Sequence, residues 1–281
     1  MRTIGFLFPP SETRASLVAG GLTAIERQAR QLSRAGADAL FAVDVVPLTQ
    51  LPAGVTAITA AGVLEVVEAR DRVVAIAAGL IIDERAIAAV LAAPVPAMLV
   101  RDATQTGAEG IERLDALTFA GGVMTISGTI VRRIASGLGE WDMESTLIRA
   151  AAEDPATARI ELSSLPVYAP NRRRDVPMLW MLPQSPNESR DAGDAVIAAA
   201  QKGCLDWPAR FIHPPIEDAL VRALAPTKVT PNQVTLATGV IGIIAGVAFA
   251  CGQLWLGPGL ALLTGPLDGV DGKLARTRVE F

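Results

Sequence analysis

The longest uncharged stretch of the chain limits its fold more than any other feature. No Asp, Glu, Lys or Arg occurs from Val229 to Leu267. A helix needs about 20 residues to cross the hydrocarbon core of a bilayer. The stretch is therefore too long for one span, and it fits one full span followed by the first half of another. The alternative is a pair of buried helices in a soluble protein, and the length of the stretch favours the membrane.

The start of the first helix is marked by its sequence. Thr230 is expected at the N-cap, Pro231 at the first helical position and Gln233 at the third, which together form a capping box with a proline at its first position. Residues 252–259 are rich in glycine and contain a tryptophan, which predicts a turn at the membrane interface. The second helix is expected to begin near Leu260.

Basic residues flank the uncharged stretch on both outer sides, and the turn between the two helices contains none. These residues are Arg222, Lys228, Lys273, Arg276 and Arg278. Positive charge favours the cytoplasmic side. The pattern predicts a multi-pass protein of the inner (cytoplasmic) membrane, with a cytoplasmic N-terminal domain and membrane lipid as a partner.

Just before this hairpin, apolar residues recur at mostly helical spacing with charges between them. Trp207, Phe211 and Ile216 belong to this pattern, and Pro214 and Pro215 predict a bend. The pattern is typical of a helix that lies on a membrane surface. An ordinary amphipathic helix of a soluble protein is the alternative.

Residues 1 to about 180 show a different pattern, in which short apolar strands alternate with amphipathic helices. This alternation predicts an α/β domain with a mostly parallel sheet. The expected strands are RTIGFLF, ADALFAV, RVVAIAA and VPAMLV, and the expected helices are GLTAIERQARQLSRAG, DERAIAAVLAA and EWDMESTLIRAAAED. We expect three parts: an α/β domain at 1–182, a linker at 183–202, and an interfacial helix with two membrane helices at 203–281.

Composition narrows the possible functions. The formal net charge of −4 gives no basic field of the kind that binds nucleic acid. Cys204 and Cys251 are far apart and His213 is the single histidine, so a zinc site or a disulfide framework is not expected. Arg172 to Arg174 form a short basic run, which we interpret as a solvated loop, with contact to anionic lipid heads as the alternative.

Two aspartates lie at the end of the predicted second helix. On a helical wheel, Asp271 lies about 60° from Asp268, while Gly272 and Ala275 lie within about 40° of it. One face of the helix therefore carries acidic and small side chains. Asp268 and Asp271 are expected to bind one divalent cation through oxygen ligands, and Arg276 at the edge of the face is expected to contact phosphate. A carboxylate within a membrane is a functional-site hypothesis by default. The alternative is a DG turn in a soluble loop.

The residues from Asp268 to Arg276 resemble the first half of the signature of the CDP-alcohol phosphatidyltransferases, D-x2-D-G-x2-A-R, and Thr230 to Thr235 resembles the segment that opens their first membrane helix. The resemblance implies a six-helix, usually homodimeric membrane domain. Its activity would be transfer of a phosphoalcohol or phosphatidyl group from a CDP-linked lipid or alcohol donor to an alcohol, with release of CMP. It also implies Mg²⁺ or Mn²⁺ at Asp268 and Asp271, and binding of the CDP moiety by Gly272, Ala275, Arg276 and Asn232.

The second half of that signature, G-x3-D-x3-D, is absent from these 281 residues. In the family, its aspartates complete the metal site and supply the general base. No residue of this chain is therefore assigned as the base. We expect the chain to be part of a longer enzyme and to be inactive in transfer by itself.

The N-terminal domain resembles nucleotidyltransferases through AGGLTAIERQARQLSRAGADALFAV, and some relatives fuse such a domain to the membrane transferase. The start of the chain, FLFPPSETRAS, lacks the glycine-rich loop that would hold a triphosphate, and Asp83 is a weak match to a metal-binding aspartate. A degenerate domain is favoured over an active one. Two alternative functions remain: cytidylyl or sugar-nucleotide transfer by this domain, and a non-catalytic regulatory domain on a membrane anchor.

Overall fold

The computed structural model describes residues 1–45, 50–103 and 112–280. The chain divides into two compact units. The sheet unit comprises Met1–Leu17, Thr23–Pro166 and Met178–Glu188. The hairpin unit comprises Val18–Leu22, Val167–Pro177 and Ser189–Phe281. These boundaries differ from the expected 1–182 and 203–281, because segments distant in sequence pack into the second unit.

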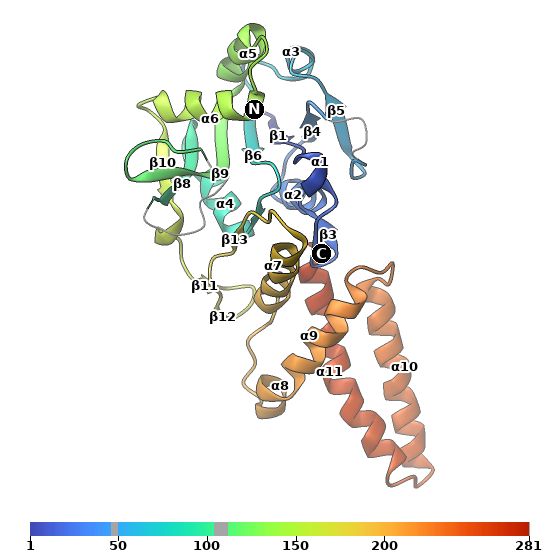
Figure 1. The fold of residues 1–281 in the computed structure, drawn as a ribbon. Coiled ribbons are helices and arrows are strands. Elements are labelled where there is room, and N and C mark those ends of the chain that lie inside the picture. Colours follow the sequence, from blue (N-terminus) through green and yellow to red (C-terminus); the bar gives the residue numbers. More distant parts are fainter. Residues whose placement is uncertain (46–49, 104–111, 281) are drawn as a thin grey trace. The chain divides into compact units, whose positions relative to one another are not determined.

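The sheet unit is built on a seven-stranded sheet with the order β10-β8-β9-β6-β1-β4-β5 (Figure 1). Its strands are β1 (Thr3–Leu7), β4 (Ala39–Val43), β5 (Val55–Ile58), β6 (Arg72–Ile76), β8 (Ala97–Asp102), β9 (Thr118–Ser127) and β10 (Ala158–Glu161). β9 runs antiparallel to both of its neighbours, and the other strands run parallel to one another. The prediction of a mostly parallel α/β sheet is confirmed, although the antiparallel strand was not anticipated.

Helices cover both faces of this sheet because its strands are apolar on both sides. Along β1, Ile4 and Phe6 belong to one core cluster while Leu7 belongs to the other. The first cluster includes residues from α3 (Val63–Val66), α5 (Gly128–Gly137) and α6 (Met143–Glu153). The second includes residues from α2 (Ala24–Arg34) and α4 (Glu84–Ala92). The three helices expected from sequence correspond to α2, α4 and α6.

Short elements complete the two units. They are α1 (Glu12–Ala15), β2 (Val18–Ala19), β3 (Leu22–Thr23), β7 (Ile81–Ile82), the 3-10 helix at Leu162–Ser164, β11 (Tyr168–Ala169), β12 (Arg174–Asp175) and β13 (Trp180–Met181). β13 pairs with β7, and β11 pairs with β12 in a small antiparallel hairpin.

The hairpin unit is mainly helical. Its helices are α7 (Pro186–Ala199), which begins in the sheet unit, α8 (Trp207–Phe211), α9 (His213–Leu224), α10 (Pro231–Ala250) and α11 (Leu256–Thr277). The expected linker at 183–202 is wrong as a description of structure, because most of it forms α7. Its polar residues cover the outside of the helix, and Ala192, Val196 and Ile197 are buried.

Two helix starts test the sequence analysis directly. At α10 the capping box is present: the Gln233 N–H donates to the Thr230 hydroxyl (3.3 Å), and the Thr230 N–H donates to the Gln233 side chain (3.0 Å). α11 begins at Leu256 rather than near Leu260. Pro258 does not prevent this, because proline is tolerated in the first turn of a helix.

The predicted interfacial helix is interrupted. α8 ends at Phe211 and α9 begins at His213, with Pro214 and Pro215 in the first turn of α9. The break therefore lies just before the prolines that predicted a bend. Trp207 and Phe211 remain exposed and contact each other, with ring centroids 5.9 Å apart.

α10 and α11 pack side by side as an antiparallel hairpin (Figure 1). A small core, which includes Val234, Val270 and Leu274, holds the hairpin to α7 and α9. Elsewhere on the hairpin large apolar side chains are exposed, among them Leu236, Ile243, Phe249, Trp255 and Leu262.

One helix among the described residues, Pro231–Ala250, is long and apolar enough to cross a membrane. In its most apolar window 22% of the residues are buried. α11 does not meet the same criterion, and one such helix is weak evidence. The multi-pass membrane location therefore remains a prediction.

Candidate functional site

The acidic face of α11 is the first candidate site. Asp268 is exposed and Asp271 is partly buried. Asp271 accepts hydrogen bonds from the Thr235 hydroxyl of α10 and from the N–H of Gly272. The contact with Thr235 fixes the position of Asp271 across the hairpin.

Gly272 and Arg276 form one feature of this helix. A Cβ at Gly272 would lie 3.1 Å from Nη1 of Arg276, so the guanidinium folds back over the glycine, with the charge of Asp271 nearby. Nε of Arg276 donates to the carbonyl of Ala200 (2.6 Å). The expectation that Gly272 leaves open space for a ligand is thus modified, because part of that space holds Arg276. Ala275 is buried, and Asn232 is exposed at the start of α10.

The aspartates fit a hard cation in donor type but supply only part of its coordination. Carboxylate oxygens are the ligands that Mg²⁺ and Mn²⁺ prefer. The described residues contain no group of three or more His, Cys, Asp or Glu side chains that could hold a metal ion. The metal assignment of Asp268 and Asp271 therefore remains a prediction.

A lysine beside this face is buried, which the sequence analysis did not anticipate. Lys273 of α11 is almost fully buried. Its ammonium donates to the side chains of Gln201 and Asp218 and lies 3.8 Å from the carboxylate of Glu217. A charged lysine is buried only when it is paired. The sequence does show two adjacent carboxylates, Glu217 and Asp218, within an amphipathic segment. It does not show their partner, because Lys273 lies more than 50 residues away on α11.

Two arginine side chains bind the carboxyl end of α7. Its last carbonyls have no partner within the helix, and they carry the negative end of the helix dipole. Arg174 of β12 donates to the carbonyls of Ala198 (2.6 Å) and Gln201 (2.8 Å), and Arg276 donates to that of Ala200. β12 and α11 are therefore fixed to the same short segment.

A cavity in the sheet unit is the second candidate site. Its volume is about 190 Å³. It lies where β6 ends, at the carboxyl edge of the parallel strands, which is the usual position of ligand sites in open α/β sheets. Its charged lining residues are Arg14, Glu112, Asp142 and Glu144, and its apolar lining includes Ala77, Leu80, Ile148, Trp180 and Leu182.

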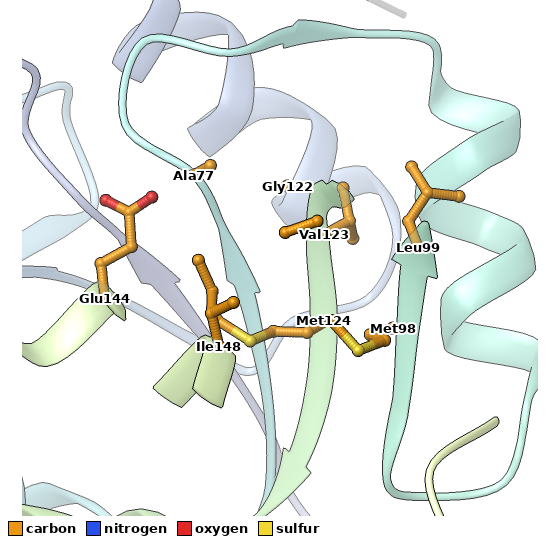
Figure 2. Close-up of a pocket in the computed structure, with 9 residues that line it drawn as sticks. Ala77, Met98, Leu99, Gly122, Val123, Met124, Glu144 and Ile148 are labelled. Atoms are coloured by element: carbon orange, nitrogen blue, oxygen red, sulfur yellow. The ribbon is translucent and has the colours of Figure 1, made fainter. Parts of the chain in front are cut away.

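Glu144 is the distinctive group of this cavity. Its carboxylate accepts a hydrogen bond from the N–H of Ala78, at 3.2 Å and 3.4 Å to its two oxygens. Figure 2 shows Glu144 and Ile148 on α6 in a narrow, mostly apolar pocket that shares several residues with the cavity. Ile148 lies beside Met124, and the Glu144 carboxylate points towards Ala77. Burial, together with repulsion from Asp142 and Glu112, raises the pKa of Glu144 to about 7, and the Ala78 N–H and Arg14 oppose this.

The other carboxylates of the cavity already have structural roles. Asp142 caps α6 by accepting from the N–H of Ser145 (2.7 Å), and Glu112 pairs with Arg149 (2.7 Å). Asp83, the weak match to a metal-binding aspartate, caps α4 and forms a salt bridge with Arg85 (2.9 Å). These contacts indicate structural roles for Asp142 and Glu112, which line the cavity, and for Asp83, which does not.

Comparisons with known proteins give limited information. No family model matches the chain, and no curated protein matches it. Among solved structures, the chain is similar to a crystal structure of 4-diphosphocytidyl-2C-methyl-D-erythritol synthase. The TM-score is 0.40 and the identity 14%, over 61% of this chain and 95% of that one. A similarity of this size decides neither fold nor function, so the functional argument depends on the two sites.

Proposed function

We propose that the hairpin unit forms part of the site of a CDP-alcohol phosphotransferase, which moves a phosphoalcohol or phosphatidyl group from a CDP-linked donor to an alcohol and releases CMP. The observation that carries this proposal is the arrangement on α11. Asp268 and Asp271 precede Arg276, whose guanidinium lies over Gly272, and all lie in the second half of α11, directly after the uncharged stretch. The Arg276 guanidinium near Asp271 supports the proposal, because a metal-bound pyrophosphate needs both carboxylate and guanidinium partners.

Each residue has a defined role in this proposal. Asp268 and Asp271 would hold Mg²⁺ or Mn²⁺, which would neutralise phosphate charge and polarise the phosphoryl oxygens. Thr235 orients Asp271, and Arg276 neutralises phosphate at the edge of the site. Asn232 and Ala275 are proposed to contact the CDP moiety, as the family resemblance implies.

The apolar surface of the hairpin supports a membrane setting for this site. The exposed side chains of α10 and α11 would be covered by lipid, and Trp255 would lie at the interface. A second copy of the chain is proposed as a partner through the same hairpin. The lipid-linked form of the donor would then reach the aspartates from the bilayer.

Binding of CDP tests this proposal, because binding does not need the general base. The 281-residue chain in lipid nanodiscs is titrated with CDP by calorimetry, with and without Mg²⁺. We expect Mg²⁺-dependent binding that weakens at least tenfold in Asp271→Asn. The matched control is Asp191→Asn, an exposed aspartate on α7. No Mg²⁺-dependent binding by the wild type, or equal binding by Asp271→Asn, contradicts the proposal.

A second candidate function, nucleotidyl transfer from CTP by the sheet unit, is favoured by the position of its cavity. The cavity lies at the carboxyl edge of the sheet, and Arg14 is its cationic lining residue. The neighbouring carboxylates oppose a triphosphate unless a metal ion accompanies it. CTP turnover by the full chain, reduced at least fivefold by Arg14→Gln but not by Arg70→Gln at an exposed site, would support this function. Absence of CTP binding would contradict it.

A further inference from the structure

The cavity of about 190 Å³ belongs wholly to the sheet unit, because all of its lining residues lie in that unit. Small residues on the sheet side keep this space open. They are Ala77 and Ala78, directly after β6, and Ala120 and Gly122 on β9. A water molecule takes about 30 Å³ in the liquid, so the cavity has room for about six waters or for one small organic molecule.

Glu144 is the polar group that points into this space. Its carboxylate extends from α6 towards Ala77, at the end of β6 (Figure 2). The two oxygens share the single N–H of Ala78, at 3.2 Å and 3.4 Å. A carboxylate offers about four acceptor positions, so Glu144 keeps most of them for a ligand.

The charges around Glu144 do not balance. The other charged groups that line the cavity are Arg14, Glu112 and Asp142. Glu112 is paired with Arg149, 2.7 Å away. Asp142 accepts from a backbone N–H, and within the described residues neither Asp142 nor Glu144 forms a salt bridge. Arg14 balances one of these two carboxylates, so the cavity lacks one positive charge.

A proton can supply this charge near neutral pH. Burial, with repulsion from Asp142 and Glu112, raises the pKa of Glu144 to about 7. A cationic group beside the carboxylate would favour the ionised form instead. A proton and a ligand cation therefore compete for Glu144.

The surroundings favour an organic cation over a metal ion. In the part of the chain that the structure describes, no three His, Cys, Asp or Glu side chains are grouped so that they could hold a metal ion. Much of the remaining lining is apolar and includes Leu80, Ile148 and Leu182. Such side chains suit the carbon skeleton of a ligand rather than the water that a hydrated ion keeps.

Trp180 gives the cavity a rigid apolar wall. Its Nε1–H donates to the carbonyl of Gly121 (2.8 Å), and the guanidinium carbon of Arg101 lies 3.6 Å from the centre of its ring. These two contacts fix the ring before any ligand arrives. A preformed wall lowers the entropy cost of binding.

We propose that this cavity binds a small organic ammonium ion, whose charge pairs with Glu144 and whose apolar part lies against Trp180 and Ile148. Asp142 supplies a further negative charge to the same space. The inference depends on neither of the functions proposed above, because it requires neither a metal ion nor a nucleotide.

Calorimetry with phenethylamine and 2-phenylethanol tests the inference, because the two molecules have nearly the same shape and only the first is charged. The full chain in phosphatidylcholine nanodiscs is titrated at pH 8, and nanodiscs without protein give the heat of partition into lipid. We expect the wild type to bind phenethylamine at least tenfold more tightly than 2-phenylethanol. Glu144→Gln should weaken phenethylamine binding at least tenfold. The matched control, Glu153→Gln at an exposed position of the same helix, should change it less than twofold.

The pH dependence of binding gives a readout that a merely structural role of Glu144 would not change. With a pKa of about 7, roughly a tenth of Glu144 is ionised at pH 6 and roughly nine tenths at pH 8. An alkylammonium group keeps its proton at both values. Phenethylamine should therefore bind the wild type about tenfold more tightly at pH 8 than at pH 6, and Glu144→Gln should show no such difference.

Several results would overturn the inference. They are a wild type that binds neither molecule, equal affinity for the amine and the alcohol, and phenethylamine affinity that is the same at pH 6 and pH 8. All three are measured on the wild type, so they do not depend on the folding of a variant. Unchanged phenethylamine binding in Glu144→Gln, with its fold checked by circular dichroism, would overturn it as well.

Arg14→Gln separates the inference from nucleotidyl transfer by the same unit. Removal of a like charge should leave phenethylamine binding unchanged or tighten it, whereas the second candidate function predicts a loss of CTP turnover in this variant. Weaker phenethylamine binding in Arg14→Gln would contradict the charge balance on which the inference rests.

Discussion

Both units contain paired buried charges, such as Asp83 with Arg85 in the sheet unit, but they differ in one buried group each. In the hairpin unit, Lys273 is closed off between carboxylates, and Arg278 donates to several carbonyls around the end of α9. In the sheet unit, Glu144 has one backbone N–H and lies in a cavity with other carboxylates nearby. The comparison shows two different roles for a buried charged group. The hairpin unit fixes its helices with paired charges, whereas the sheet unit keeps a carboxyl group that can change its protonation state near neutral pH.

The strongest test of this comparison removes the buried cation. Lys273→Met leaves Asp218 and Glu217 without their ammonium, and breaking a buried pair costs about 3–5 kcal/mol. We expect the hairpin unit to lose about this much stability while the sheet unit is unchanged. Hydrogen exchange by mass spectrometry in detergent measures α9 and α11 separately from β1 and β6.

Lys228→Met is the matched control, because Lys228 is exposed. We expect it to leave exchange in both units as in the wild type. Equal protection of α9 and α11 in Lys273→Met and Lys228→Met would show that the buried charges do not hold these helices, and the contrast between the units would be lost.

The second test concerns the close packing of α9 on α11. A Cβ at Gly269 would overlap the carboxylate of Glu217, whereas a Cβ at Gly242 of α10 would meet nothing within 4 Å. Gly269→Ala is expected to cost about 1–3 kcal/mol through overpacking. Gly242→Ala is expected to be neutral or slightly stabilising, because alanine favours helix. Thermal unfolding in detergent compares the two. A larger cost at Gly242 would mean that α10 has a close partner, such as a second copy of the chain.

The features that could be predicted from the sequence are those set by residues close together in the chain. The capping box of α10, the hairpin and the strands of the parallel sheet each depend on residues close together in the chain. The features it missed depend on distant residues. The antiparallel strand β9 lies between β6 and β8 although it follows both, and Lys273 meets a carboxylate from another helix. The helix α7 was hidden because its exposed face is rich in polar residues that also favour turns.

The placing of the candidate site shows the same limit. The spacing of Asp268, Asp271 and Arg276 is local, so their order along one helix could be predicted. The position of the Arg276 side chain over Gly272 depends on its hydrogen bond to the carbonyl of Ala200. The position of the Asp271 carboxylate depends on its hydrogen bond from Thr235 of α10. The sheet-unit cavity left no sequence signal, because Arg14, Glu144 and Trp180 come from three separate segments.

The last test concerns the sheet unit. The pKa of Glu144 is raised from 4.5 to about 7, so the folded protein holds this proton more tightly than the unfolded chain. As the pH rises from about 4.5 to 7, the unfolded chain releases its proton first, and the free energy of unfolding falls. Glutamine cannot titrate, yet its oxygen can still accept from the Ala78 N–H. Glu144→Gln should therefore match the wild type near pH 4.5 and exceed its stability above pH 7, by up to about 3 kcal/mol.

Urea unfolding of the sheet unit at pH 5 and pH 8, followed by circular dichroism in detergent, measures this difference. The control is Glu153→Gln at the end of the same helix, which should not alter the pH dependence. If wild type and Glu144→Gln lose stability in parallel between the two pH values, Glu144 is ionised in the folded state like an ordinary surface carboxylate. Glu144 would then not titrate near neutral pH, and the contrast with the buried Lys273 of the hairpin unit would be lost.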